Sequence, residues 1–385
     1  MMARRSAGLL LVVQLFVIKK LGVHKSFSVT CRGPGFEKEG AVNFGLLMSF
    51  RNSSRNELSF SELYRRHVDL CVEAEDLGFD TIWLTEHHFV EDGYSPSMLP
   101  LAAAIAARTK RIRIGTFVLL LPLHNPLRVA EDAATIDVLS NGRFDLGLGQ
   151  GYVPREFIGF NVPREERSRR LREGVEIIRR LFTENDVTFE GRSYIVRGAT
   201  LYPKPVQQPH PPIWIGARSR SATERAGRNG YHLAGLGAEQ AQIYRDALRA
   251  AGRNPDDFNV AELCFGYIAA KKEKAWDEAE FALHHLLSCY GQWIAEANDV
   301  PGDENFARVP PVGELRHAGS VGFDAVIGTP DDLVAKVEQL EQHATHLALG
   351  LALPGIEPKK IRASMKLVAE KVIPHFRRRT RKRAG

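Results

Sequence analysis

Three titratable residues stand together after an apolar run, and their types suit proton transfer. Glu86, His87 and His88 follow residues 79–85, which are typical of a buried strand. Histidine is a common general base near neutral pH. Successive strand residues point to opposite sides, so we expect at most one of the two histidines to face the interior of the fold. The alternative is a hydrogen-bonded structural histidine beside a structural glutamate.

A metal centre at these residues would need a third ligand. No other predicted strand end supplies a convincing one, because the remaining histidines and acids lie in less suitable contexts. We therefore predict that the site holds no metal.

A second group of residues suits the binding of a phosphate. The predicted strand 213–216 is followed by Arg218, Ser219, Arg220, Ser221 and Thr223 at or just before the start of a predicted helix. Hydroxyl, guanidinium and free backbone N–H groups at a helix N-terminus form an anion site. The alternative is that the serines only cap the helix.

Glycines alternate at the end of the predicted strand 143–149, at Gly147, Gly149 and Gly151. Glycine at a strand end marks close approach by a ligand, such as a flat aromatic ring, or by another part of the protein. The sequence leaves both explanations open.

The elements that carry these groups follow a regular alternation. The predicted strands are residues 42–48, 79–85, 112–121, 143–149, 213–216, 231–235, 258–270 and 345–353, with a small hairpin at 187–196. The predicted helices are residues 61–78, 97–108, 126–141, 164–182, 219–228, 240–251, 274–297, 331–343 and 358–373. Eight strands that alternate with helices predict one α/β (β/α)8 TIM barrel, in which the strands' C-terminal ends share one face. An open doubly wound sheet is the runner-up, but it would want a GxGxxG turn that is absent after the first strand.

We expect three parts in the chain: an N-terminal extension at 1–40, the barrel at 41–376 and a basic tail at 377–385. The extension's apolar run is too short to span a bilayer. It is a signal or anchor, a disordered leader, or sequence upstream of the true start, and we favour the last two. Residues 298–328 form an insertion between the seventh and eighth barrel units, predicted as a lid or as a loop without a role.

Composition is that of an ordinary globular protein, with 44% hydrophobic and 25% charged residues. The net charge of +6 comes from the two ends of the chain, which argues against a nucleic-acid partner. The cysteines Cys31, Cys71, Cys264 and Cys289 form no CxxC pair, so we predict reduced thiols. We expect a cytoplasmic protein without a membrane partner.

Several motifs together resemble one family. They are Glu86-His87-His88-Phe89, the segment 121–143 with Pro126, Glu131, Asp132 and Asp137, the turn 147–152, and the segments 328–330 and 361–374. In this order and spacing the chain resembles the bacterial luciferase-like flavin-dependent monooxygenase family over nearly all of residues 41–376.

The resemblance implies a barrel that binds reduced FMN, which a separate NAD(P)H:flavin reductase supplies. The flavin reacts with O2 to give a C4a-hydroperoxide that oxygenates a small organic substrate. By the family's pattern His87 is the catalytic histidine, with Glu86 beside it. A non-proline cis peptide beneath the flavin falls on Phe117 and Val118, and the phosphate-binding serine on Ser219. A homodimer is implied by the same analogy.

The chain departs from its light-emitting relatives at the cofactor. Gly149 and Gln150 stand where those relatives carry Cys and Arg, and Arg218 replaces an acidic residue before the serine. Arg218 can compensate for the lost phosphate contact, while bioluminescence is disfavoured. The predicted cofactor-binding residues are Phe117, Val118, Gly149, Gln150, Arg218, Ser219 and Thr223.

Two alternatives to an FMN-dependent monooxygenase remain. One is an F420-dependent oxidoreductase on the same barrel, which the Glu-His-His-Phe motif and the short phosphate loop disfavour modestly. The other is a flavin-binding protein without turnover, which is disfavoured because Glu86 and His87 are both present.

Overall fold

The computed structural model describes residues 42–53, 58–299, 309–318 and 324–384. The extension expected at 1–40 lies outside these residues, as does part of the predicted insertion at 298–328. Within the described residues, none of the helices combines the length and apolar character needed to cross a membrane.

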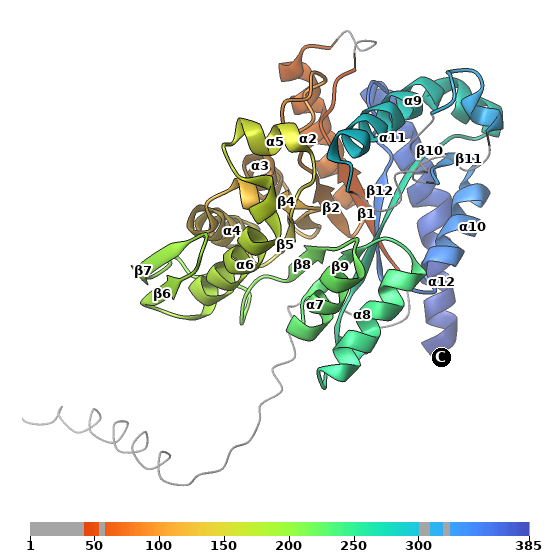
Figure 1. Ribbon diagram of the computed structural model, residues 1–385. Coiled ribbons are helices and arrows are strands. Elements are labelled where there is room, and N and C mark those ends of the chain that lie inside the picture. The colour runs from red at the N-terminus through yellow and green to blue at the C-terminus, as the bar shows by residue number, and fades with distance from the viewer. Residues whose placement is uncertain (1–41, 54–57, 300–308, 319–323, 385) are drawn as a thin grey trace, which may run out of the picture. The chain divides into compact units, whose positions relative to one another are not determined.

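Eight parallel strands of the described residues close into a barrel (Figure 1). In barrel order they are β1 (Asn43–Met48), β2 (Thr81–Leu84), β3 (Arg113–Thr116), β5 (Phe144–Gly149), β8 (Ile213–Gly216), β9 (His232–Gly235), β10 (Val260–Ile268) and β12 (His346–Gly350). The last strand pairs with the first, with Asn43 opposite His346, and this pairing closes the ring. The predicted (β/α)8 barrel is confirmed, with each strand except β8 one to several residues shorter than predicted.

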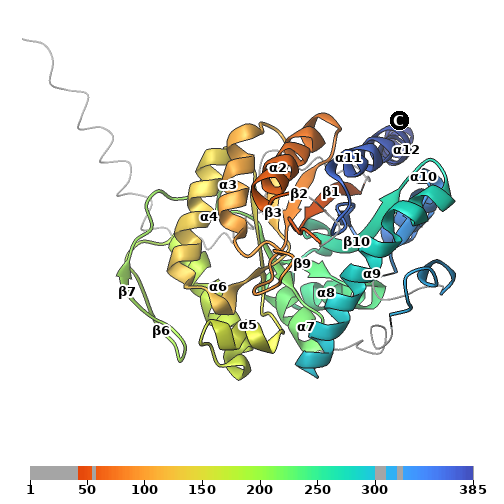
Figure 2. The same ribbon diagram turned by 90° about the horizontal axis from the view of Figure 1, so that it is seen from above.

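Helices surround the strands, as the view along the barrel shows (Figure 2). They are α2 (Phe60–Asp76), α3 (Met98–Arg108), α4 (Pro126–Ser140), α5 (Pro154–Gly159), α6 (Arg167–Thr183), α7 (Arg220–Asn229), α8 (Ala238–Ala250), α9 (Lys272–Ala297), α10 (Pro330–Leu340), α11 (Pro358–Leu367) and α12 (Ile373–Ala384). Side chains cap the N-termini of several helices: Ser59 caps α2, Asn125 caps α4, and Thr329 forms a capping box with Asp332 at α10.

The basic segment that follows residue 376 is helical as far as Ala384, so it does not form a separate tail. A π-helical turn (Val368–Val372) joins α11 to α12, which runs through it. Arg377 pairs with Asp80 at 2.7 Å and Arg379 with Glu338 at 3.0 Å. The predicted boundary at 376 therefore falls inside a helix.

The barrel interior is a packed core and not a channel. Trp83 and Trp214 lie in it with ring centroids 5.4 Å apart, and both side chains are fully buried. Gly45 and Gly115 make room for Trp83, because a Cβ at either position would lie 2.4 Å or 2.3 Å from the indole. Because the two tryptophans fill the barrel interior, the C-terminal ends of the strands are the place left for a ligand.

The third predicted strand, 112–121, is interrupted where the chain bends. β3 ends at Thr116, and the two-residue β4 (Leu119–Leu120) resumes pairing with β5. Between them, the peptide bond from Phe117 to Val118 is cis, at the position that the family resemblance implied. The apolar run is continuous in the sequence, but the strand that it forms is interrupted.

Two glycines of β5 accommodate this bend. A Cβ at Gly147 would lie 1.9 Å from the Thr116 carbonyl oxygen, and one at Gly149 would lie 2.4 Å from the Val118 side chain. The hydroxyl of Thr116 also donates to the Gly147 carbonyl at 2.7 Å. Close approach by the neighbouring strand therefore explains Gly147, one of the two explanations that the sequence left open.

Two smaller elements complete the fold. The predicted hairpin is present as β6 (Val187–Glu190) and β7 (Ile195–Ala199). The insertion contains a strand that the sequence did not indicate, β11 (Val326–Gly328), which pairs with the end of β10 outside the barrel. Its described segment 309–318 is fastened to α9 by Arg316, which pairs with Glu280 at 2.7 Å.

We expect Gly147→Ala to lower the free energy of unfolding by about 2–3 kcal/mol, since the new methyl group meets backbone that cannot move alone. The control is Gly216→Ala, whose Cβ would lie 3.2 Å and 3.3 Å from Val118 methyl groups and at an ordinary 3.7 Å from the Leu148 carbonyl oxygen. Urea unfolding of both variants measures the difference. Equal stability of the two variants would contradict this account of the bend.

Candidate active site

A cavity of about 920 Å³ lies at the C-terminal ends of the strands. His87 and Glu86 line it together with Phe117, Val118, Gly149, Gln150, Arg218 and Ser219, so the structure brings together all predicted site residues except Thr223. His87 is at the cavity wall, whereas His88 is directed away from it, toward Glu86 and the ring of Phe160. The prediction that only one of the two histidines faces the interior is confirmed.

The Glu86 carboxylate, almost fully buried, accepts hydrogen bonds from three groups. His88 Nε2 donates at 2.8 Å and His124 Nε2 at 2.7 Å to Oε1, and the backbone N–H of Leu120 donates at 2.7 Å to Oε2. Burial alone would raise the pKa of Glu86, but the two histidines outweigh it and lower the pKa to about 2. Glu86 therefore joins the end of β2 to the chain just beyond the cis peptide.

His87 is held by a residue that the sequence did not single out. Its Nδ1 donates to Glu156 Oε1 at 2.9 Å, and the same oxygen accepts the backbone N–H of His88 at 2.9 Å. Glu156 belongs to the first turn of the short helix α5 and is 1% exposed. With Nδ1 engaged, His87 Nε2 makes no hydrogen bond within the described residues and is available to a ligand.

Four aromatic rings enclose the His87 imidazole. Its centroid lies 4.8 Å from that of Tyr94, 5.9 Å from Tyr152, 5.8 Å from Tyr290 and 4.3 Å from Trp293. Tyr290 and Trp293 come from α9, so that helix covers the imidazole. The imidazole is thereby kept from bulk water, at 6% exposure of the residue.

Behind this enclosure lies a second charged group, which the sequence analysis also missed. Asp92 binds the buried Arg51 Nε at 2.7 Å and His285 Nε2 at 2.8 Å. The hydrogen bond with Asp92 is the main reason that the pKa of His285 rises to about 9. The hydroxyl of Tyr94 connects this region to the cavity wall, at 3.1 Å from Thr85 Oγ1 and 3.0 Å from the Tyr290 hydroxyl.

The far end of the cavity has the groups expected of a phosphate site. Ser219 caps α7 by accepting from the Ala222 N–H at 3.4 Å, and it also lines the cavity beside Arg218 and Gln150. The cap is therefore confirmed, and phosphate binding by this serine stays a prediction. Thr223 does not line the cavity: it is fully buried, and its hydroxyl donates to the Ser219 carbonyl at 3.1 Å. It supports the cap from within the helix.

Two groups of side chains have the composition of metal sites. They are Glu86, His88 and His124, and Asp92, His285 and Cys289, with potential ligand atoms within 4.8 Å of one another. In the first group both imidazoles already donate to one carboxylate oxygen, and in the second the Arg51 guanidinium occupies the carboxylate. Hydrogen bonds account for both arrangements, and the absence of a metal stays a prediction.

The cavity fits a phosphorylated flat ring on three counts. Val118 projects over the positions that Gly149 and Gly216 leave empty, which gives an apolar floor at the mouth of the barrel. A cap serine and a half-buried arginine lie at the other end. The volume is within the range of cofactor pockets.

Comparison with known proteins identifies the class. Residues 42–347 match the family described as luciferase-like monooxygenase, and the chain belongs to that family. An F420-dependent glucose-6-phosphate dehydrogenase of Amycolatopsis mediterranei is 37% identical over 298 residues, which are 73% of this chain and 86% of the relative. The oxygenase component of the flavin-dependent trigonelline monooxygenase of Acinetobacter baylyi is 26% identical over 352 residues, 87% of this chain and 96% of the relative.

Among solved structures, the monooxygenase RslO1 from Streptomyces bottropensis superposes with a TM-score of 0.74 at 28% identity. The match covers 87% of this chain and 99% of that one. The family and the relatives together show that the chain is an oxidoreductase that depends on a flavin or on F420.

We expect Glu86→Gln to be destabilising in a pH-dependent way. Glu86 has a lowered pKa, so its contribution to the free energy of unfolding is complete above its ordinary value of 4.5 and is lost as the pH falls through about 2. His124 has a raised pKa, so its contribution is complete below 6.5 and is lost as the pH rises through that raised value. The stability difference between the two proteins should therefore be largest at about pH 5–6 and shrink in more acidic solution.

Denaturant unfolding across a pH series measures this difference. Glu91→Gln, at an exposed carboxylate of the neighbouring loop, is the control and should show no such dependence. A difference that stays constant from neutral to strongly acid pH would contradict the role given to the Glu86 charge.

Proposed function

We propose that the protein is the oxygenase of a two-component, FMN-dependent monooxygenase that uses O2 to oxygenate a small organic substrate. The observation that carries this proposal is the imidazole of His87, fixed by Glu156 and enclosed by four aromatic rings at the edge of a cavity that Arg218 and Ser219 also line. Reduced FMN would supply the electrons that activate O2.

The residues of the chain have separate tasks in this proposal. Ser219, Arg218 and Gln150 bind the phosphate, while Phe117, Val118 and Gly149 form the surface beneath the ring. Thr223 acts only through Ser219.

His87 moves a proton at Nε2, because its Nδ1–H stays bonded to Glu156. Glu86 is a positioning residue: its carboxylate is occupied by His88, His124 and Leu120 and has no proton to exchange with a substrate. Glu156 Oε1 accepts one hydrogen bond from His87 Nδ1 and another from the backbone N–H of His88, and together these bonds hold the imidazole in one orientation.

Exclusion of water is the other requirement of oxygen activation by a flavin. Tyr290 and Trp293 of α9 supply a fixed part of this barrier beside His87. The lid predicted at 298–328 lies partly outside the described residues and stays a proposal. Its described segment 309–318 packs on the side of α9 that carries Glu280.

The proposed partners are a separate NAD(P)H:flavin reductase and a second copy of the chain in a homodimer, in the cytoplasm. The name of the Acinetobacter baylyi relative, an oxygenase component, supports the separate reductase. Residues 41–376 are proposed as the catalytic barrel.

An F420-dependent oxidoreductase is the second candidate. The names of relatives that are 28% to 37% identical support it, among them F420-dependent glucose-6-phosphate dehydrogenases. On the same cavity, His87 would then accept a proton from a substrate hydroxyl while hydride leaves for the deazaflavin.

Reoxidation kinetics separate the two candidates. Enzyme with bound reduced FMN is mixed with O2 and the absorbance of oxidised flavin is followed. The proposal predicts two resolved phases with a delay before oxidised flavin forms. A single phase as fast as that of free flavin, together with F420 reduction by a panel of alcohols, would establish the second candidate.

Substitutions test the proton transfer. We expect His87→Ala to retain reduced FMN but to lose product formation by about 10²–10⁴-fold. Glu156→Gln should keep the fold and lose about tenfold or more in turnover, because the amide no longer stabilises charge on the imidazole.

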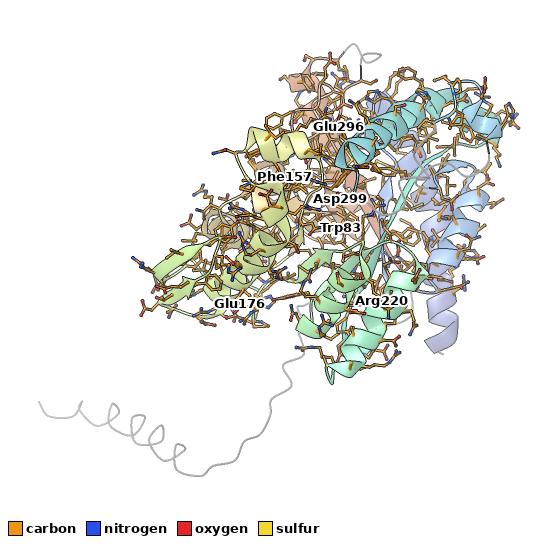
Figure 3. All side chains as sticks on the ribbon, in the orientation of Figure 1. Trp83, Phe157, Glu176, Arg220, Glu296 and Asp299 are labelled. Atoms are coloured by element: carbon orange, nitrogen blue, oxygen red, sulfur yellow. The ribbon has the colours of Figure 1, made fainter. Side chains whose placement is uncertain are left out.

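Glu296→Gln is the matched control. This carboxylate on α9 lies 3.8 Å from Arg155, the neighbour of Glu156, and has no contact with His87. Figure 3 labels Glu296 on α9. Undiminished turnover in Glu156→Gln, or an equal loss in both variants, would remove Glu156 from the mechanism.

A further inference from the structure

The cavity continues past the phosphate site into a cleft between α6 and α7. From α6 it is lined by Arg172, Val175, Glu176 and Arg179, and from α7 and beyond by Ala222, Arg225, Ala226, Arg228, Asn229 and Arg253. Figure 3 labels Glu176 on α6 and Arg220 at the start of α7, on the two helices that border this cleft. We call these residues the arginine cleft.

The arginine cleft is long compared with a single phosphate. Its α7 wall runs from Ser219 to Asn229, which at the rise of an α-helix is about 15 Å. FMN ends at its phosphate, which in the proposed function lies at Ser219. The cleft therefore begins where FMN ends.

Positive charge in the cleft exceeds what its own carboxylates neutralise. Arg179 pairs with Glu176 at 2.8 Å, and Arg228 lies 3.6 Å from Glu224. For Arg172, Arg225 and Arg253, the described residues offer no carboxylate within ion-pair distance. Burial lowers the pKa of Arg225, and repulsion from Arg172 and Arg228 lowers it further.

Arg172, Arg228 and Arg253 are exposed and Arg225 is half-buried, so the cleft is open to solvent; what an ordinary solvated helix face does not explain is that these arginines converge. Arginines on a helix surface commonly pair with a carboxylate of the same helix, as Arg180 does with Glu184 at 2.8 Å and Arg179 with Glu176 at 2.8 Å, whereas Arg172 and Arg225 have no such pair in the described part of the chain. The arginines of the cleft instead converge from two helices and from Arg253 on one cavity that is continuous with the cofactor site. Like charges that converge on a cavity are characteristic of a site for an anion.

We propose that the arginine cleft is a second anion subsite, which binds a polyanionic extension of the flavin beyond its first phosphate. The inference rests on the proposed function only in that a flavin phosphate occupies Ser219. Two cofactors have this chemistry: FAD, through its second phosphate, and F420, through a tail of several glutamates. In either case the guanidinium groups recognise phosphate or carboxylate oxygens along the cleft.

Equilibrium binding tests the proposal on the full-length protein. Dissociation constants for FMN, FAD and F420 with several glutamates are measured by flavin fluorescence at low and high salt. We expect one of the two extended flavins to bind at least about tenfold more tightly than FMN, since one charge-assisted hydrogen bond is worth about that factor. This preference should shrink at high salt, and which flavin shows it identifies the source of the anion. A preference for F420 would support the subsite and at the same time favour the second candidate function over the FMN-dependent oxygenase.

The double variant Arg172→Ala/Arg225→Ala should remove the preference and leave the FMN affinity within about twofold. Arg180→Ala, on α6 but not among the residues that line the cavity, is the matched control and should change neither constant. Ser219→Ala should weaken all three flavins alike, because all share the first phosphate.

Two results would overturn the subsite. If FMN binds and neither extended flavin binds more tightly, the subsite is wrong and the proposed function stands. If the double variant weakens FMN as much as the extended flavin, the arginines act on the first phosphate or on the fold. Failure of all three flavins to bind would overturn the proposed function together with the subsite.

Discussion

The candidate site depends on one buried charge, the carboxylate of Glu86. A buried ionised carboxylate is unfavourable unless donors surround it, and Glu86 meets this condition with His88, His124 and the Leu120 N–H. The interaction fixes the end of β2 against the chain that follows the cis peptide. The chain has left β2 at this point: His88 donates to Glu86, and His87 lies at the cavity wall, where Glu156 accepts its Nδ1–H.

The floor and the wall of the cavity both depend on this contact between Glu86 and the chain after the cis peptide. β3 stops at Thr116 and resumes as β4 at Leu119, and the bend presents Phe117 and Val118 to the cavity. Gly147 and Gly149 on β5 admit the bend because they have no side chains. The wall that carries His87 and the apolar floor at Val118 thus follow neighbouring strands, and the arginine cleft extends the same cavity between α6 and α7.

Much of the fold could be predicted because each strand and helix leaves a local pattern of apolar residues. The strand end that carries His87 was visible for that reason, and the Phe117–Val118 bond was placed only through the family resemblance. Glu156 could not be found, since nothing in the sequence relates it to a histidine far upstream. Tyr290 and Trp293, whose rings cover His87, belong to an amphipathic helix, where the sequence pattern does not distinguish them from ordinary core residues. Thr223 was misjudged because a hydroxyl near a helix start has the same signature whether it meets a ligand or the backbone.

The most direct test of the account is a crystal structure of the protein with bound FMN. The account predicts that the isoalloxazine ring lies over Val118 and the Phe117–Val118 peptide, with the phosphate at Ser219 and Arg218 and the ring within reach of His87 Nε2. FMN bound elsewhere, or a His87 imidazole that has left Glu156 and turned away from the ring, would contradict it.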